Sequence, residues 1–81
     1  MLSLDLETVK GVIKEELQLA SLPLNESFQS LRFEEWQLAR IQQSILRAFN
    51  IYQRPSLADN VYTLTDKLQK QRQPVSPSPA T

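Results

Sequence analysis

The sequence contains no cysteine and no histidine. Without cysteine there can be no disulfide, thiolate nucleophile or cysteine-based zinc site. Histidine is the commonest general base and the commonest nitrogen ligand of metals, so its absence weighs against catalysis and metal binding. Gly11 is the single glycine, whereas dinucleotide-binding fingerprints and phosphate-binding loops need several. We therefore expect no enzyme active site, no bound cofactor and no metal ion.

Net charge and long apolar runs are also lacking. Nine basic and nine acidic side chains balance, whereas nucleic-acid-binding proteins usually carry a clustered basic face. No apolar run approaches the ~20 residues that a membrane-spanning helix requires. The opening stretch MLSLDLETVK lacks the basic start and apolar core of a secretory signal. We expect no nucleic-acid partner, no membrane partner and a cytoplasmic location.

What the 81 residues do contain is a helical periodicity of apolar side chains that recurs three times. It predicts helices over about 5–18, 34–49 and 61–71, with Asn50 ending the second and Asn60 capping the third. The predicted inward-facing residues are Leu6, Val9, Ile13 and Leu17, then Leu38, Ile41, Ile45, Ala48 and Phe49, then Val61, Leu64 and Leu68.

Two connections separate these helices. Residues 19–32 carry several apolar side chains, so we expect this long segment to pack against the helices, and Pro23 prevents easy continuation of the first one. Gly11 costs about 1 kcal/mol relative to alanine in mid-helix and is expected to allow a close packing approach. The second connection contains Pro55 and a short helical turn predicted after Ser56. The predicted fold is all-α, a small antiparallel bundle of three main helices plus that turn.

The composition changes near the end of the chain. Residues 72–81, RQPVSPSPAT, are rich in proline and small polar residues and have no periodicity, which is typical of an extended linker. We predict a helical domain over 1–71 and a flexible linker over 72–81. Such a linker suggests a domain that belongs to a longer polypeptide.

The second predicted helix resembles that of the acyl and peptidyl carrier protein family. In that family a serine in an L-G-x-D-S-L motif opens the helix and carries a phosphopantetheine arm. The matching apolar positions here, four, six, ten and fourteen residues after Glu35, are Ala39, Ile41, Ile45 and Phe49. Further similar positions are Phe28 and Leu31, Phe49-Asn50-Ile51, and Asn60-Val61-x-x-Leu64. The likeness covers roughly residues 5–70 and rests on spacing more than on identities.

The chain departs from the family at the motif itself, which reads Leu31-Arg32-Phe33-Glu34-Glu35-Trp36. The resemblance implies that Glu35 stands where the modified serine would be. Modification needs a hydroxyl that attacks the diphosphate of coenzyme A, and a carboxylate gives no stable equivalent product. The resemblance therefore implies a non-catalytic pseudo-carrier, a docking or scaffolding domain of a polyketide or nonribosomal peptide assembly line. Its partner would be another protein or domain of the megasynthase.

We predict an interaction surface made of Arg32, Glu35, Trp36, Arg40 and Arg47. For Trp36 we favour a buried anchor, because the family's leucine at this position is partly buried. The alternative is an exposed contact, since tryptophan is enriched at interface hot spots. Arg40 and Arg47 are seven residues apart and share a helix face. Together with Arg32 and Arg54 they form either ordinary solvated surface, which we favour, or a basic docking patch for an acidic partner.

Two alternative functions remain open. The stretch Gln29-Ser30-Leu31 superficially resembles Asp-Ser-Leu, and the chain would then be a functional carrier modified at an unusual serine, Ser30 or Ser27. Counted from Ser30, however, the residue ten positions later is Arg40, where the family has an apolar residue. The other alternative is an unrelated helical dimerisation or docking module.

Overall fold

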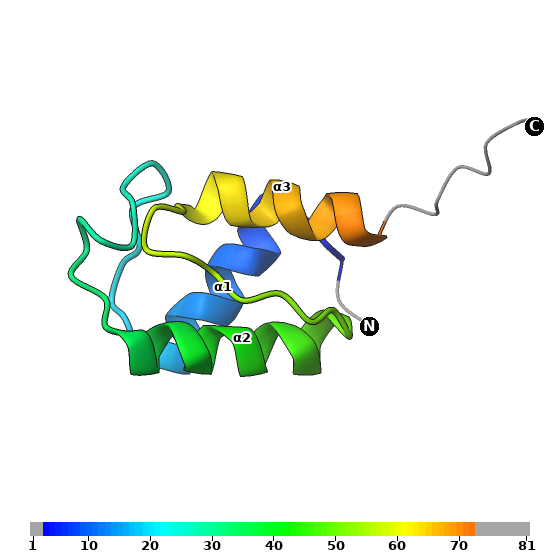
Figure 1. Ribbon diagram of the computed structural model, residues 1–81, viewed down its shortest axis with the longest axis horizontal. Helices are drawn as coiled ribbons and strands as arrows, with labels where there is room; N and C mark the ends of the chain where they lie inside the picture. The colour runs from blue at the N-terminus through cyan, green and yellow to red at the C-terminus, as the bar shows by residue number, and fades with distance from the viewer. Residues whose placement is uncertain (1–2, 73–81) are drawn as a thin grey trace, which may run out of the picture.

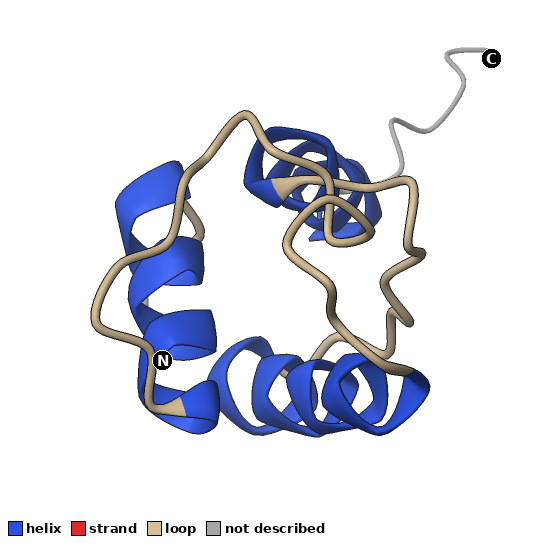
Figure 2. Ribbon diagram, turned by 90° about the vertical axis from the view of Figure 1, so that its left-hand side faces the viewer, coloured by secondary structure: helices blue, strands red, loops and turns tan. Residues whose placement is uncertain are grey.

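The computed structural model describes residues 3–72, which form three helices and no strand (Figure 1). The helices are α1 (Leu6–Leu17), α2 (Glu35–Phe49) and α3 (Val61–Arg72). In Figure 1, α2 and α3 run the same way along the molecule, and α1 crosses obliquely behind them. Helix α1 contacts both of the others and closes one side of the bundle (Figure 2). The predicted all-α, three-helix fold is confirmed.

Local capping sets the ends of α1. The Thr8 backbone N–H donates to the Asp5 carboxylate at 2.9 Å, which caps the start of the helix. At the other end Gln18 adopts a left-handed conformation with φ of 55°. Its N–H donates to the Glu15 carbonyl and the next N–H donates to the Lys14 carbonyl, so a Schellman-type cap ends the helix. Pro23 lies too far along the chain to be the cause.

Gly11 does not mediate close packing, so that prediction is wrong. The residue is exposed, and a Cβ added there would meet no atom within 4 Å. It therefore lies on the solvent side of α1. There glycine loses more backbone entropy on folding than alanine would, and no close contact compensates for the loss.

Asn60 caps α3 as predicted. The Thr63 N–H donates to Asn60 Oδ1 at 2.8 Å, and the Asn60 N–H donates to Thr63 Oγ1 at 2.9 Å. The turn predicted after Ser56 is a single hydrogen-bonded turn, in which the Asp59 N–H donates to the Ser56 carbonyl at 3.0 Å. Helix α3 ends at Arg72, one residue beyond the predicted end. The remainder of the predicted linker, 73–81, lies outside the described residues.

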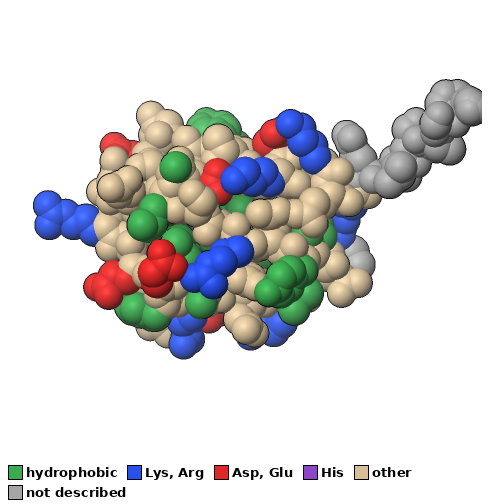
Figure 3. Space-filling view, viewed as in Figure 1, with side chains coloured by type: hydrophobic (Ala, Val, Ile, Leu, Met, Phe, Trp, Pro, Cys, Tyr) green, Lys and Arg blue, Asp and Glu red, His purple; other side chains and the backbone are tan. Residues whose placement is uncertain are grey.

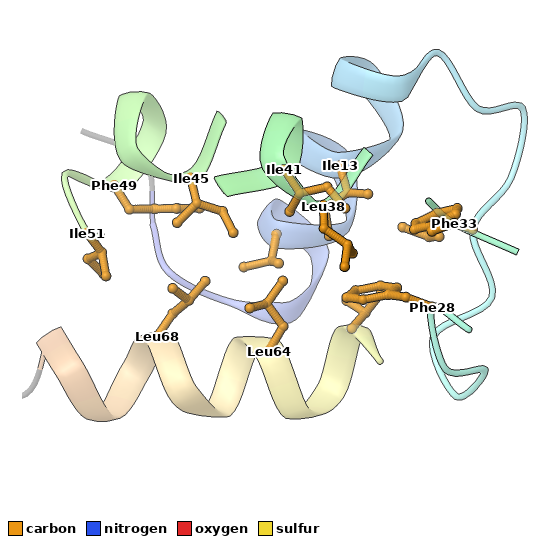
Figure 4. Packing of buried hydrophobic residues seen from close by; sticks show 13 residues of the cluster. Ile13, Phe28, Phe33, Leu38, Ile41, Ile45, Phe49, Ile51, Leu64 and Leu68 are labelled. Carbon is orange, nitrogen blue, oxygen red and sulfur yellow. The ribbon is translucent and has the colours of Figure 1, made fainter. Parts of the chain in front are cut away.

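The core contains most of the apolar side chains that the periodicity predicts (Figure 4). Leu6, Leu17 and Ala48 are the exceptions, since they are only partly buried at its edge. The first connection also contributes to the core, as predicted, through Leu22 and Phe28. The core cluster consists of Val9, Ile13, Leu22, Phe28, Phe33, Leu38, Ile41, Ile45, Phe49, Ile51, Val61, Leu64 and Leu68.

The two connections meet at one end of the bundle. Because α2 and α3 run the same way, the second connection returns along the length of the molecule before α3 begins (Figure 1). There the Phe28 N–H donates to the Asp59 carbonyl at 2.8 Å and the Gln29 N–H donates to the Leu57 carbonyl at 2.9 Å. These bonds hold the segment that leads into α2 against the start of α3.

Candidate functional site

Residues 28–33 form a hydrogen-bonded turn directly before α2. The Arg32 N–H donates to the Gln29 carbonyl and the Phe33 N–H donates to the Phe28 carbonyl, both at 3.0 Å. These are the two bonds of a Schellman motif, which frequently includes an apolar contact between the same outer residues. Here the Phe28 and Phe33 rings stack with their centroids 5.3 Å apart (Figure 4). The packing of these two rings in the core therefore fixes the conformation of the turn that leads into α2.

Arg32 occupies the left-handed position of this turn, with φ of 63°. That conformation costs an L-residue about 1–2 kcal/mol, whereas glycine adopts it freely. Position 32 is also where the carrier motif has its glycine. The backbone thus has the shape that a glycine would permit, although the residue is an arginine with an exposed side chain.

Helix α2 begins at Glu35. Before it, the Glu34 N–H donates to Gln37 Oε1 at 2.8 Å, which satisfies one free donor at the helix end. The Glu35 carboxylate accepts a 2.7 Å hydrogen bond from Arg54 Nη2, but these side chains are 72% and 52% exposed. Such an exposed pair contributes little to stability. Glu35 is therefore a surface carboxylate in the first turn, where the helix dipole favours it.

Trp36 is 58% exposed, so the favoured prediction of a buried anchor is wrong. Successive side chains of an α-helix are separated by about 100° around its axis. Trp36 therefore lies on nearly the opposite side of α2 from Ile45, which is fully buried. The apolar face of α2 packs into the core, so Trp36 on the opposite side faces solvent.

Arg40 and Arg47 both bind one carboxylate, that of Glu16 in α1. Arg40 Nε donates to Glu16 Oε2 at 3.1 Å, and Arg47 Nη2 donates to Glu16 Oε1 at 2.8 Å. The buried Ser44 hydroxyl donates to the same Oε1 at 2.6 Å. The Glu16 side chain is 16% exposed, whereas the two arginine side chains are 58% and 67% exposed. The shared face predicted for the two arginines is confirmed, and α1 supplies its counter-charge.

The hydrogen bond from Ser44 lowers the pKa of Glu16, although burial raises it; the guanidinium groups of Arg40 and Arg47 lower it further. Glu16 is therefore ionised at neutral pH. It lies in a cleft of about 450 Å³ between α1 and α2. The cleft is lined by Val12, Glu15, Glu16, Gln18, Arg40, Ser44, Arg47 and Ala48.

The sequence reasoning missed Glu16 and Ser44. Glu16 looks like one more charged residue near the end of an amphipathic helix. Ser44 carries a weak signal, because it lies next to the buried Ile45 and between the turns that bear Arg40 and Arg47. A small hydroxyl residue at such a position indicates that polar contacts between helices lie beside the apolar face.

Asp59 is a buried residue at the centre of a second polar cluster. Its carboxylate accepts hydrogen bonds from Lys67 Nζ at 2.9 Å, Thr63 Oγ1 at 2.9 Å and the Ser56 N–H at 3.0 Å. Burial raises the pKa of Asp59, but the bonds from Lys67, Ser56 and Thr63 outweigh it and leave the pKa below its ordinary value. Because its partners all lie in the second connection and α3, this cluster joins those segments and stabilises the fold.

Ser30, the rival candidate for modification, is exposed within the turn that precedes α2. Its N–H donates to Ser27 Oγ at 3.0 Å. The residue lies five positions before the first residue of α2, whereas the serine of the carrier motif opens the helix. Glu35, and not Ser30, therefore occupies the head of the helix.

The predicted interaction residues thus fall into two groups. Arg32, Glu35 and Trp36 are exposed at the start of α2, and Arg40 and Arg47 follow along the helix. On the face shown in Figure 3, acidic and basic side chains are interspersed and the apolar ones form small separate patches. That face has no large region of one charge.

No protein-family model, curated protein or solved structure matches this chain. Across residues 3–72, no three acidic, histidine or cysteine side chains are grouped so that they could hold a metal ion. None of the three helices is long and apolar enough to span a bilayer.

Proposed function

We propose that the chain is a non-catalytic pseudo-carrier that acts as a docking or scaffolding domain of a polyketide or nonribosomal peptide assembly line. The observation that carries the proposal is the start of α2. Its first residue is Glu35, which has no hydroxyl to modify, and the neighbouring Trp36 is 58% exposed. A helix that has the register of a carrier, a carboxylate in place of the serine and an exposed tryptophan is suited to recognition without cargo.

The register of α2 supports the resemblance. Ile41, Ile45 and Phe49, which match apolar positions of the family, are all buried in the core. Arg32 has the left-handed backbone that the motif's glycine would adopt without strain. Both features would be coincidental in an unrelated helical module.

The exposed side chains at the start of α2 support a docking role. A large aromatic side chain that is left in solvent adds little to the stability of the domain but is a frequent hot spot of protein interfaces. Trp36 lies beside Glu35, which pairs with Arg54, so polar groups adjoin the exposed ring. An apolar contact with polar neighbours is the usual composition of a protein interface.

Enzymatic loading with phosphopantetheine tests the absence of cargo. The chain is incubated with coenzyme A and a broad-specificity phosphopantetheinyl transferase, beside an active carrier protein as control, and its intact mass is measured. We expect no gain of mass. A gain of one phosphopantetheine group that disappears in the Ser30→Ala variant would overturn the proposal in favour of a carrier modified at Ser30.

The oligomeric state and the genetic setting test the docking role. We expect a monomer in light scattering, because the domain would bind a different protein; a tight dimer would favour the unrelated dimerisation module.

We also expect a ketosynthase or condensation domain in the same polypeptide or in adjacent genes. Their absence would contradict the assignment to an assembly line.

A further inference from the structure

One face of α2 that lies outside the core carries Trp36, Arg40, Gln43 and Arg47, and all four are exposed. Successive residues advance a helix by about 100° and 1.5 Å. These four side chains therefore fall within about 60° of one another and extend over about 17 Å. We call them the α2 stripe. It has an aromatic side chain at one end and two cations farther along.

The two cations are held in place and only partly neutralised. Within residues 3–72, Glu16 is the one carboxylate at ion-pair distance from Arg40 or Arg47, at 3.1 Å and 2.8 Å. Glu15 also lines the cleft, but it is exposed and makes neither ion pair. A guanidinium has five N–H donors, and Glu16 uses only a part of them. Each arginine therefore still has donors on its solvent side, and Glu16 limits the entropy lost when they bind.

The spacing of the arginines indicates what kind of segment they fit. Residues seven apart on an α-helix are separated by about 10.5 Å along its axis. A second helix lying along α2 would present carboxylates seven residues apart at this same spacing. On one face of an extended strand, side chains are about 6.6 or 13 Å apart instead. The backbone positions of Arg40 and Arg47 therefore match a helix better than a strand. Their guanidinium groups converge on Glu16 and bind the partner carboxylates with the donors that Glu16 leaves free.

We propose that the α2 stripe binds an acidic amphipathic helix of a partner protein. Two carboxylates of that helix, seven residues apart, pair with Arg40 and Arg47. An apolar side chain of the same helix, four residues beyond the carboxylate that pairs with Arg40, packs on Trp36. This inference rests on the proposed docking function and adds the chemistry of the partner.

Peptide titration provides the test. The ¹⁵N-labelled chain is titrated with a helical peptide in which leucine is followed by glutamate four residues later and a second glutamate seven residues after that. A control peptide of the same composition has its glutamates five residues apart, on different faces. We expect the first peptide to shift the amide signals of the α2 stripe and to bind about fivefold tighter. Equal affinities, or shifts confined to other helices, would overturn the inference.

Variants locate the contact. Arg47→Gln should reduce the affinity for the first peptide to that of the control peptide. Lys70→Gln is the matched change at an exposed lysine of α3, whose side chain is 73% exposed, and should leave the affinity unchanged. Added salt should weaken binding of the first peptide, since the pairs are exposed. If both variants bind like the parent chain, the arginines are not the contact.

The outcome separates this inference from the proposed function. Enzymatic loading at Ser30 would contradict the pseudo-carrier and leave the peptide titration unaffected. Conversely, a domain of the assembly line that binds the parent chain and Arg47→Gln equally, but not Trp36→Ala, would preserve docking and reject the acidic helix.

Discussion

The Ser44 hydroxyl of α2 donates a 2.6 Å hydrogen bond to the Glu16 carboxylate of α1. Arg40 and Arg47 bind that carboxylate from the same helix. One acidic side chain thus joins α1 to three polar residues of α2 beside the apolar core. Because a largely buried carboxylate is costly without partners, this cluster contributes to stability as well as to the presentation of the arginines.

Glu16 predicts a loss of stability in acid. Ser44 above all, and then the two arginines, keep the pKa of Glu16 below its ordinary value of 4.5 despite burial. A carboxyl whose pKa is lower in the folded chain stabilises the fold fully above its unfolded pKa, and this contribution disappears as the pH falls through the folded value. We expect the free energy of unfolding to decrease as the pH falls below about 4.5. Asp59 contributes in the same direction, below its ordinary value of 3.8.

Urea unfolding of the parent chain and of Glu16→Gln, at pH 7 and at pH 3.5, measures this effect. We expect the variant to be less stable at pH 7 by about 1–2 kcal/mol and the difference to shrink in acid. Glu26→Gln changes an exposed glutamate in the same way and should be neutral. A difference that is equally large at both pH values would show that charge is not the cause.

Trp36→Ala should change the free energy of unfolding by less than about 1 kcal/mol, because a mostly exposed ring loses little contact area. Phe28→Ala, which removes a fully buried ring, should cost about 3 kcal/mol or more. Trp36 is the only tryptophan, so its fluorescence reports one position. We expect ready quenching by acrylamide in the folded chain. Strong protection from the quencher, or a costly Trp36→Ala, would mean that the ring is buried.

Arg32→Gly should raise the free energy of unfolding by about 0.5–1 kcal/mol. Glycine relieves the left-handed strain, although it adds entropy to the unfolded chain. Arg32→Ala is the control, because it removes the same side chain and keeps the strain. Thermal unfolding by circular dichroism compares the three proteins. If alanine stabilises as much as glycine, the backbone conformation is not the reason.

Gly11→Ala should stabilise the chain by about 1 kcal/mol. The new methyl group enters open space, and alanine has the best helix propensity. The reverse type of change at an exposed site of the same helix, Glu15→Gly, should destabilise it. Thermal unfolding measures both. A destabilised Gly11→Ala would show that the added methyl group does not enter open space.

Thr65→Val tests a buried hydroxyl. Thr65 is 5% exposed, and its Oγ1 has no hydrogen-bond partner among the described residues. Valine has nearly the same shape and no polar atom to desolvate, so we expect a gain of about 1 kcal/mol. Thr65→Ser keeps the hydroxyl, loses the methyl group and should be less stable than the parent. Chemical denaturation distinguishes these outcomes; a loss with valine would reveal a partner for the hydroxyl.

Local features of the sequence predict the helices well. Asp5, Asn50 and Asn60 each act on backbone groups within a few residues of themselves. The apolar periodicity of each helix can likewise be recognised from the helix segment alone. The same reasoning predicts that the first connection is packed, because an apolar segment in a small domain has no other way to leave water. The caps and the periodicity are short-range effects, and the residues that cause them are neighbours in the sequence.

The resemblance to carrier proteins also comes from the sequence alone, through the spacing from Glu35 to Phe49, and it remains a proposal. The sequence further determined three amphipathic helices, their caps and the absence of a hydroxyl group at position 35. Only the tertiary structure decided that Trp36 faces solvent and that Glu16 gathers two arginines. Glu16 lies 24 residues before Arg40 and 31 before Arg47. No local pattern encodes such pairs, because they form only when α1 packs across α2.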